Sequence, residues 1–315
     1  MHKKITIIGA GSVGAATAYS ILSRNAAAEV VLIDVNVDKA LGEALDIKQA
    51  TPFLDNCDIY AGSYSDAKDS DVVILTSGVG RRPGQTRLEL VQTNVGITKS
   101  VAKEIVKYAP NALYLFVANP VDILTYAFLK YTGLPKNQVF GTGTVLDTIR
   151  LRTRLAEIYH VNKQQVHANV LGEHGDTSFV AWNSATIAGV PLNEYTASIA
   201  TATDLIAEYS REDVETYVKK SGGKIISRKG CTNFGIATTS MHIVKTISGD
   251  APSAMTVSSL HEGEYGIEDV CLSSLSLVGA DGVKSIITQP LSDDELRKMH
   301  ASAQALKEVI RSIEF

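Results

Sequence analysis

A glycine-rich segment near the amino terminus constrains the fold of this 315-residue chain more than any other feature. Gly9-Ala10-Gly11-Ser12-Val13-Gly14 follows an apolar run, residues 4–8, that is typical of a buried parallel strand, and it precedes a helix-like stretch, residues 15–23. Glycines at these spacings permit a tight turn, close approach of a pyrophosphate and tight packing of the helix on the strand. The free N–H groups at the start of such a helix can bind phosphates.

A second strand-like run, residues 30–33, ends at Asp34, 20 residues after Gly14. A carboxylate at this distance can accept hydrogen bonds from ribose hydroxyls and repel a 2′-phosphate. The alternative is a glycine-rich turn with an unrelated acid nearby. The strand–turn–helix setting favours binding of NAD, in preference to NADP.

Strand-like and helix-like segments alternate along the first 143 residues. This succession predicts an α/β fold, with an amino-terminal Rossmann domain (residues 1–143) built on a doubly wound parallel sheet. Beyond it the pattern changes to helix-like stretches followed by extended ones, with a final amphipathic helix over residues 293–313 after a capping signal at Ser292. We therefore expect residues 144–315 to form an α+β substrate domain. The helices expected are residues 40–50, 88–108, 121–131, 192–200, 212–219 and 239–247, and the strands are residues 71–75, 112–117, 138–140, 253–258, 270–277 and 283–287.

The composition narrows the class of protein. The net charge is −4 without a block of lysine and arginine, so a nucleic-acid surface has no electrostatic support. The first strand begins almost at once, which leaves no room for a signal peptide, and no apolar run reaches the roughly 18 residues of a membrane span. Cys57, Cys231 and Cys271 have no metal-ligand spacing, so we expect no metal and reduced thiols in a cytoplasmic enzyme.

A histidine lies in the turn Gly172-Glu173-His174-Gly175, at the end of a strand-like run over residues 166–171. A titratable ring between small neighbours suits proton transfer at neutral pH, although a single histidine is more often structural. Asp147 and Arg150 are three residues apart and share one face of an expected helix. They form either a simple helical ion pair, or a set in which Asp147 orients and charges His174 while Arg150 grips a carboxylate.

The segment 80–87 carries three arginines between glycine and proline, which is typical of a loop. Its charges are either solvated, as we expect for Arg82, or delivered to a bound anion when the loop closes. Asn119, beside Pro120, can hold a nicotinamide ribose or a substrate hydroxyl, or can be a plain turn residue. Thr232 is a candidate for the wall of a substrate pocket, although the pattern around it favours an ordinary turn.

These groups together suit the reversible reduction of a 2-oxo acid to a 2-hydroxy acid. A nicotinamide supplies hydride, and the protein must supply a proton and stabilise the developing oxyanion. His174 as imidazolium would donate the proton, and Asp147 would raise the pKa of His174 and fix its tautomer. Arg87 would polarise the carbonyl, and Arg150 would anchor the substrate carboxylate.

The sequence resembles the L-lactate/L-malate dehydrogenase family over essentially its whole length. The matching segments are residues 9–14, 34, 81–87, 117–121, 146–150 and 171–176. The resemblance implies His174 as proton donor and acceptor, Asp147 as its partner, Arg87 as the carbonyl polariser and Arg150 as the carboxylate clamp, with Asn119 and Thr232 facing the substrate. Besides the glycine turn (Gly9, Gly11, Gly14), it implies NAD contacts at Val13, Asp34, Lys39, Tyr64, Gly78, Val79, Ser100, Val117, Ala118, Asn119 and Thr142.

The branch of the family is set by opposing features. Arg81 resembles the malate enzymes, where an arginine at this loop position matches a dicarboxylate substrate. Thr232 and the loop continuation 87–91 resemble lactate enzymes. Arg152 and His167 match the pair that binds fructose 1,6-bisphosphate in activated bacterial lactate dehydrogenases, or they are ordinary polar residues; the effector pair implies a homotetramer.

On balance we expect a lactate-type enzyme of glycolysis and fermentation that acts on pyruvate. The alternatives are a malate dehydrogenase, which reduces oxaloacetate, a broader L-2-hydroxy acid dehydrogenase, and an NAD-binding sensor without turnover. A sensor would be expected to lack one or more catalytic residues. The histidine, its acid partner and both arginines are all present, which favours an enzyme.

Overall fold

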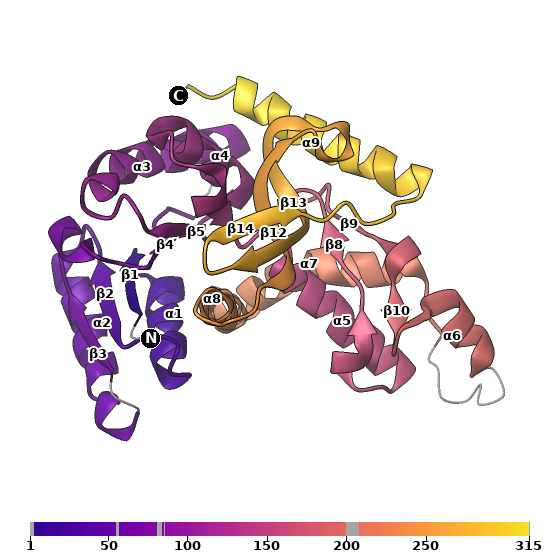
Figure 1. The fold of residues 1–315 in the computed structure, drawn as a ribbon, viewed down its shortest axis with the longest axis horizontal. Helices are drawn as coiled ribbons and strands as arrows, with labels where there is room; N and C mark the ends of the chain where they lie inside the picture. Colours follow the sequence, from indigo (N-terminus) through magenta and orange to yellow (C-terminus); the bar gives the residue numbers. More distant parts are fainter. Residues whose placement is uncertain (1–2, 55–56, 81–83, 85, 200–207, 315) are drawn as a thin grey trace.

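The computed structural model describes residues 3–54, 57–80, 84, 86–199 and 208–314. Within these ranges the chain forms one nine-stranded sheet and two smaller antiparallel sheets, with helices packed on both faces of the large sheet (Figure 1). No helix in the described part has the length and apolarity needed to cross a bilayer.

The large sheet has the strand order β14-β13-β12-β6-β5-β4-β1-β2-β3. Six strands run parallel: β1 (Lys4–Ile8), β2 (Glu29–Ile33), β3 (Asp58–Ala61), β4 (Val72–Leu75), β5 (Leu113–Phe116) and β6 (Val139–Gly141). The order 3-2-1-4-5-6 is that of a Rossmann sheet, so the prediction of a doubly wound parallel sheet is confirmed. The edge strand β3 was missed because its four residues give no long apolar run.

Two layers of helices enclose this sheet. One layer contains α1 (Ser12–Ser23), α2 (Val37–Lys48) and α8 (Phe234–Ile247), and the other contains α3 (Arg87–Tyr108), α4 (Val121–Thr132) and α9 (Asp293–Arg311) (Figure 1). Side chains alternate between the layers along each strand, so Ile7 packs against the first and Ile8 against the second. The capping box predicted at Ser292 is present, and it starts α9.

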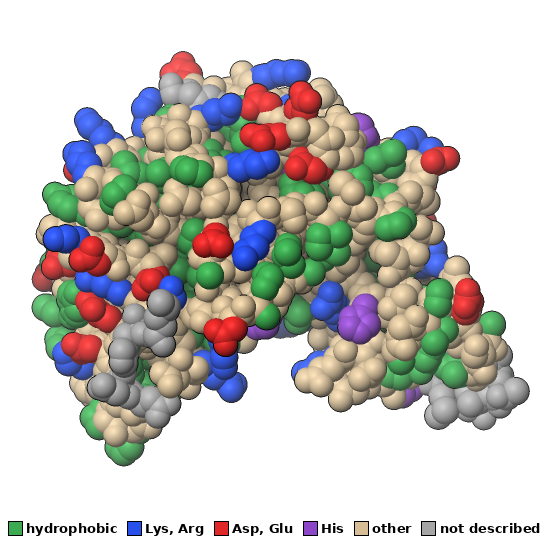
Figure 2. Space-filling view, viewed as in Figure 1, with side chains coloured by type: hydrophobic (Ala, Val, Ile, Leu, Met, Phe, Trp, Pro, Cys, Tyr) green, Lys and Arg blue, Asp and Glu red, His purple; other side chains and the backbone are tan. Residues whose placement is uncertain are grey.

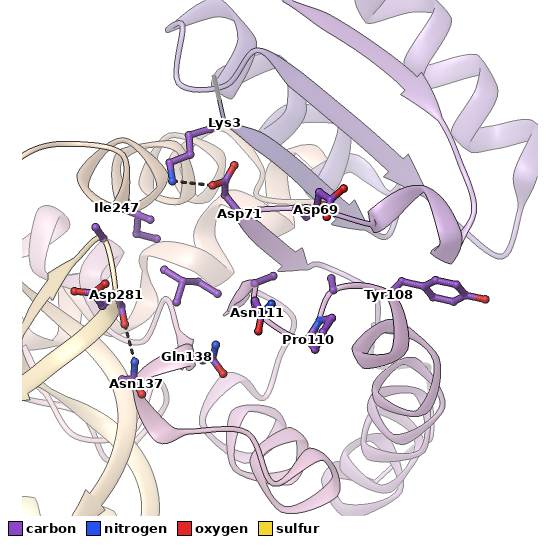
Figure 3. Close-up of a pocket in the computed structure, with 15 residues that line it drawn as sticks. Lys3, Asp69, Asp71, Tyr108, Pro110, Asn111, Asn137, Gln138, Ile247 and Asp281 are labelled. Carbon is purple, nitrogen blue, oxygen red and sulfur yellow. Dashed lines mark hydrogen bonds and ion pairs between the residues drawn. The ribbon is translucent and has the colours of Figure 1, made fainter. Parts of the chain in front are cut away.

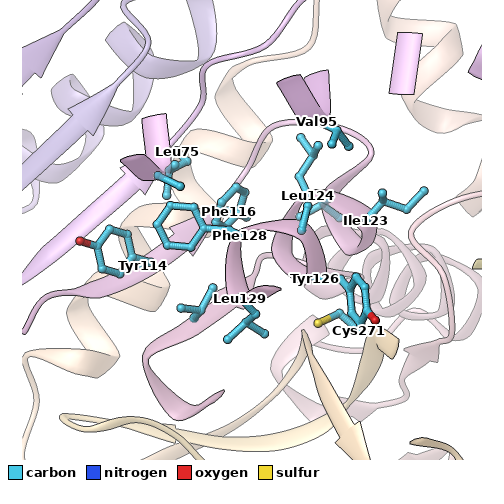
Figure 4. Packing of buried hydrophobic residues seen from close by; sticks show 14 of the residues in the cluster. Leu75, Val95, Tyr114, Phe116, Ile123, Leu124, Tyr126, Phe128, Leu129 and Cys271 are labelled. Atoms are coloured by element: carbon cyan, nitrogen blue, oxygen red, sulfur yellow. The ribbon is translucent and has the colours of Figure 1, made fainter. Parts of the chain in front are cut away.

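Aromatic packing fixes β5 against α4 (Figure 4). The ring of Phe128 lies 4.8 Å from that of Tyr114 and 5.2 Å from that of Phe116, measured between centroids. All three side chains are fully buried, and each such burial stabilises the fold by roughly 1.5–3 kcal/mol. The turn between β5 and α4, which contains Asn119 and a cis peptide bond to Pro120, is therefore held between two rigid elements.

The carboxyl-terminal half contributes three antiparallel strands to the large sheet: β12 (Ser253–Glu262), β13 (Glu268–Gly279) and β14 (Gly282–Ile286). Ser258 of β12 pairs with Gly141 of β6, so the sheet continues across residue 143. A third core cluster joins seven other elements of this half. These are α5 (Val145–Tyr159), β7 (Val166–His167), β8 (Val170–Leu171), β9 (Phe179–Val180), β10 (Thr186–Ile187), α6 (Leu192–Ser198) and α7 (Arg211–Lys229). The short strand β11 (Val190–Pro191) pairs with β10.

One expected strand was wrong in its extent. Residues 166–171 form two strands in different sheets, because β7 pairs with β10 whereas β8 pairs with β9. The break falls at Ala168 and Asn169, whose oxygens accept hydrogen bonds from the guanidinium of Arg152 at 3.0 Å each. A side chain of α5 therefore binds the chain at the point between the two sheets.

Charged side chains of both signs are interspersed over the face shown in Figure 2, which agrees with the small net charge of −4. Among the described residues, no group of three or more His, Cys, Asp or Glu side chains is arranged to hold a metal ion.

Candidate active site

The loop that carries His174 is shaped by the glycine before it. Gly172 has φ +90°, which favours glycine, and a Cβ atom there would lie 2.7 Å from the hydroxyl of Ser302 in α9. The backbone N–H of Gly172 donates to the carbonyl of Ser273, which ties the loop to β13. His174 therefore leaves the end of β8 in a direction set by β13 and α9.

One carboxylate connects His174 with Arg150. The Oδ2 atom of Asp147 lies 2.6 Å from Nδ1 of His174, and its Oδ1 atom accepts a hydrogen bond of 2.7 Å from Nη1 of Arg150. Asp147 and Arg150 lie on α5, and His174 is brought to them from β8. The ion pair and the histidine contact, which the sequence left as alternatives, both exist.

The environment favours a charged histidine. Burial by itself would lower the pKa of His174, but the carboxylate of Asp147 outweighs it, with a smaller contribution from Asp122, so the pKa is raised above its ordinary value. Burial would likewise raise the pKa of Asp147, and the nearby His174 and Arg150 lower it instead. An imidazolium beside a carboxylate is the state that can donate a proton at neutral pH.

These side chains line a pocket of about 290 Å³. The pocket brings together residues from both halves of the chain, and the side chain of His174 is 29% exposed there. Its lining includes residues that follow β1, β5 and β6 at the carboxyl edge of the sheet, where parallel α/β sheets bind ligands. The sequence-derived site residues in the lining are Val13, Val117, Asn119, Thr142, Asp147, Arg150, His174 and Thr232.

A larger cavity of about 510 Å³ lies at the opposite edge, where β1, β4, β5 and β6 begin (Figure 3). Figure 3 shows Lys3 paired with Asp71, and the side chain of Asn137 bound to the backbone of Asp281. Its lining contains none of the histidine, arginine or glycine motifs. The smaller pocket is the candidate active site.

The turn after β1 fits a dinucleotide. Gly9 has φ +112°, and a Cβ atom on Gly14 would overlap the carbonyl oxygen of Gly9, so both positions require glycine. A Cβ atom on Gly11 would meet nothing, which leaves space beside the start of α1. The first helical hydrogen bond runs from Ala15 to Gly11, so the preceding N–H groups can bind a pyrophosphate.

Asp34 braces the same turn from the end of β2. Its Oδ2 atom accepts the backbone N–H of Ala10 at 2.6 Å, and its Oδ1 atom accepts that of Asn36 at 2.8 Å. Each carboxylate oxygen has a further lone pair, so the side chain can also accept hydrogen bonds from ribose hydroxyls. The residues present fit NAD.

Comparisons with known proteins agree with this geometry. The family model described as lactate/malate dehydrogenase, NAD binding domain, matches residues 3–141, and the model for the alpha/beta C-terminal domain of the same family matches residues 144–314.

This chain belongs to the lactate/malate dehydrogenase family.

Bacterial L-lactate dehydrogenases are among its relatives within the family. The L-lactate dehydrogenase of Acetivibrio thermocellus is 43% identical over 99% of this chain and 98% of its own length. The L-lactate dehydrogenase 1 of Clostridium acetobutylicum is 44% identical over 99% of both chains. A crystal structure of the minor L-lactate dehydrogenase of Enterococcus mundtii, 38% identical, superposes with a TM-score of 0.94 over 100% of this chain and 99% of that one. The expected resemblance to bacterial L-lactate dehydrogenases, which are NAD-dependent oxidoreductases, is confirmed.

Six other residues for which the family implies NAD contacts lie after strands or on helices of the amino-terminal half. Gly78 and Val79 follow β4, and Ala118 follows β5. Lys39 lies in the first turn of α2, Tyr64 begins the 3-10 helix Tyr64–Ala67, and Ser100 is exposed on α3. None of these six lines the 290 Å³ pocket, and their contact with NAD stays a prediction.

Four further predictions concern Arg81, Arg87, Arg152 and His167. Arg81 lies outside the described residues, and Arg87 is the first residue of α3, with a side chain that is also outside the description. Arg152 lines a separate cavity of about 610 Å³ between α5 and α8, and His167 is exposed on β7.

Several pocket residues of this family member were missed from the sequence. Lys219, Gly222 and Ile226 of α7 line the pocket, and a Cβ atom on Gly222 would lie 3.8 Å from Nη2 of Arg150. The adjacent pair Gly222-Gly223 inside a helix was the available signal, because each glycine there costs up to about 1 kcal/mol relative to alanine. The expected helix ended at residue 219, whereas α7 continues to Lys229.

Asn94 of α3 was also missed. Its amide group donates to the carbonyls of Val79 at 3.2 Å and Asn119 at 2.8 Å and accepts the N–H of Val79 at 2.9 Å. It therefore joins the segments that follow β4 and β5. Its neighbours in sequence carry no pattern that separates it from a surface helical residue.

Proposed function

We propose that this chain catalyses the reversible NAD-dependent reduction of pyruvate to L-lactate. The observation that carries the proposal is the contact of 2.6 Å between Asp147 and His174 inside a pocket whose lining also includes Val13, from the glycine turn. A proton donor and a residue of the nucleotide-binding turn therefore line the same pocket. The L-lactate dehydrogenase names of the bacterial relatives support pyruvate as the substrate.

The protein's part in the reaction is proton transfer and anchoring. When bound, the reduced nicotinamide supplies a hydride to the carbonyl carbon of the 2-oxo acid. Nδ1 of His174 is engaged by Asp147, so Nε2 is the nitrogen that gives a proton to the carbonyl oxygen. In the oxidative direction the neutral ring takes that proton back. General acid catalysis of this kind contributes typically ~10²–10⁴-fold.

Arg150 would hold the substrate carboxylate through two parallel N–H bonds, with Asn119 and Thr232 on the pocket wall. Asp147 binds Nη1 of Arg150 and so fixes the orientation of the planar guanidinium. Arg87, at the start of α3, would polarise the substrate carbonyl.

Arg81 is the feature that favours a second candidate, malate dehydrogenase, because another cation would match the second carboxylate of oxaloacetate. Burying that cation opposite the methyl group of pyruvate would leave a charge without a partner, which costs several kcal/mol unless the side chain reaches water. We propose that it does reach water in the pyruvate complex.

Following NADH absorbance with pyruvate and then with oxaloacetate tests both candidates. We expect a higher kcat/KM for pyruvate. A preference for oxaloacetate would establish malate dehydrogenase as the function, and Arg81→Gln should then increase the activity with pyruvate. Activity with many 2-oxo acids would indicate the broader dehydrogenase, and no NADH consumption with any of them would indicate a sensor.

We also propose that fructose 1,6-bisphosphate binds at Arg152 and His167 in a cytoplasmic homotetramer. Arg152 contacts Ala168, the residue after His167, so both residues lie beside the same backbone segment. Pyruvate KM measured with and without the bisphosphate, together with the molecular mass in solution, tests this. Unchanged KM and mass in the wild-type protein would refute the effector site.

A further inference from the structure

A second carboxylate, that of Asp122, also contacts His174. Asp122 lies in the first turn of α4, and its side chain is 3% exposed. Its Oδ2 atom accepts the backbone N–H of His174 at 2.8 Å. Asp147 therefore binds the ring of His174, whereas Asp122 binds its main chain.

The backbone N–H groups of residues 172–174 each have a different partner. That of Gly172 donates to the carbonyl of Ser273, and that of Glu173 donates to the hydroxyl of Ser302 at 2.6 Å. These two anchors are neutral and connect the loop to β13 and α9. The anchor at His174 is a carboxylate, and it connects the loop to the segment after β5.

That segment carries two polar side chains with different targets. Asn119 lines the pocket, and Asp122 follows it within one turn. The segment cannot shift easily, because Phe128 of the same helix packs between Tyr114 and Phe116 of β5. Asn94 holds it from α3 through the carbonyl of Asn119. Asp122 therefore holds the backbone of His174 at a fixed place relative to the rigid pair of β5 and α4.

We propose that Asp122 is a positioning residue, which fixes the main chain of His174 relative to Asn119 and so directs the imidazole toward the substrate oxygen. The role rests on the proposed function, because it concerns the same proton transfer. The charge of Asp122 also acts on the ring, together with the charges of Asp147 and Arg150. Asp122 in turn is acted on by His174 and by the buried carboxylate of Glu173.

Two substitutions of Asp122 distinguish the role of its hydrogen-bond acceptor oxygen from the role of its negative charge. Asp122→Asn keeps an oxygen that can accept the N–H of His174, whereas Asp122→Leu removes both the oxygen and the charge. Thr125→Val is the matched control, because Thr125 is buried on the same helix and its hydroxyl donates within that helix, to the carbonyl of Val121.

We expect Asp122→Leu to lower kcat for pyruvate reduction by about tenfold to a hundredfold, since small displacements of a catalytic group have effects of this order. The pyruvate KM and the NADH dissociation constant should remain within about twofold, because Arg150 and the glycine turn are untouched. Asp122→Asn should recover most of kcat, and Thr125→Val should behave as wild type.

A second readout does not require turnover. The imidazole NMR signal of His174, assigned with His174→Asn, should titrate at lower pH in both Asp122 variants than in wild type and Thr125→Val. Wild-type kcat in Asp122→Leu would overturn the proposal, as would equal losses in all three variants. If the wild-type protein consumes no NADH with any 2-oxo acid, the proposed function fails, and the NMR titration still tests the contact.

Discussion

The Oδ2 atom of Asp147 lies 2.6 Å from Nδ1 of His174, although the two residues are 27 positions apart in the chain. One face of α5 therefore provides both the acid that charges the histidine and the arginine that can hold a substrate carboxylate. Because a single carboxylate contacts both cations, protonation of the ring and orientation of the guanidinium are coupled.

This coupling predicts the pH dependence of the two reaction directions. The pKa of His174 is raised, so pyruvate reduction, which needs the imidazolium, should persist above the ordinary histidine range and fall as the pH rises through the raised pKa. Lactate oxidation needs the neutral ring and should fall as the pH drops through the same pKa. Profiles of kcat/KM against pH in both directions check this; reduction that is constant up to pH 10 would contradict it.

Asp147→Asn should lower the pH at which pyruvate reduction begins to fall, and it should reduce kcat/KM for pyruvate by about 10²–10⁴-fold. The neutral amide does not stabilise the imidazolium of His174, and it allows the wrong tautomer of the ring. NADH affinity, measured by fluorescence, should be unchanged. Glu157→Gln, on the solvent side of the same helix, is the control and should have no effect on either quantity. An unchanged pH dependence of pyruvate reduction in Asp147→Asn would exclude Asp147 as the source of the raised pKa of His174.

Arg150→Lys should raise the pyruvate KM by about tenfold to a hundredfold, because a bidentate charge-assisted contact of about 1.5–3 kcal/mol is replaced by that of a point charge. Arg154→Lys is the control, since Arg154 lies one turn further along α5 and pairs with Glu157 outside the pocket. Steady-state kinetics at saturating NADH measures the effect. Equal KM values for the two variants would mean that Arg150 serves mainly as an ion-pair partner.

Two glycines of the nucleotide turn should respond differently to alanine. Gly14→Ala forces a Cβ atom into the carbonyl of Gly9, so we expect a lower Tm as well as weaker NADH binding. Gly11→Ala meets open space in the protein, so its Tm should be unchanged while NADH binding weakens, because the methyl group occupies room needed by the pyrophosphate. Thermal melts of the apoprotein and NADH titrations distinguish the two. Normal NADH affinity in Gly11→Ala would place the pyrophosphate elsewhere.

The sequence predicted the elements whose signals are local. The parallel strands are unbroken apolar runs, and the glycine turn and the capping box at Ser292 are fixed by short-range chemistry. It did not predict the split between β7 and β8, where Arg152 reaches from α5 to the carbonyl of Ala168 and the side-chain oxygen of Asn169, because these contacts join residues 16 and 17 positions apart. Asp122 was missed for the same reason, since its contact with His174 spans 52 residues and nothing beside it in the chain marks it.

Asp122 should also reduce the stability of the fold at neutral pH. Burial is the largest influence on this carboxyl and raises its pKa to about 6 from its ordinary value of 3.8. Between these two values the folded protein holds a proton that the unfolded chain has released. Stability from this group is therefore greatest below about pH 4 and declines as the pH rises through about 6. Two pKa units correspond to about 3 kcal/mol of unfolding free energy.

Asp122→Asn removes this titration, so its unfolding free energy relative to wild type should increase between pH 4.5 and pH 7.5, by at most about 3 kcal/mol. Urea unfolding at the two pH values measures the change, and Thr125→Val should show a difference from wild type that does not vary with pH. A variant that is stabilised at pH 7.5 but slower in pyruvate reduction would mean that the buried charge is retained for catalysis. A stability difference that is constant with pH would mean that Asp122 ionises as it does in the unfolded chain.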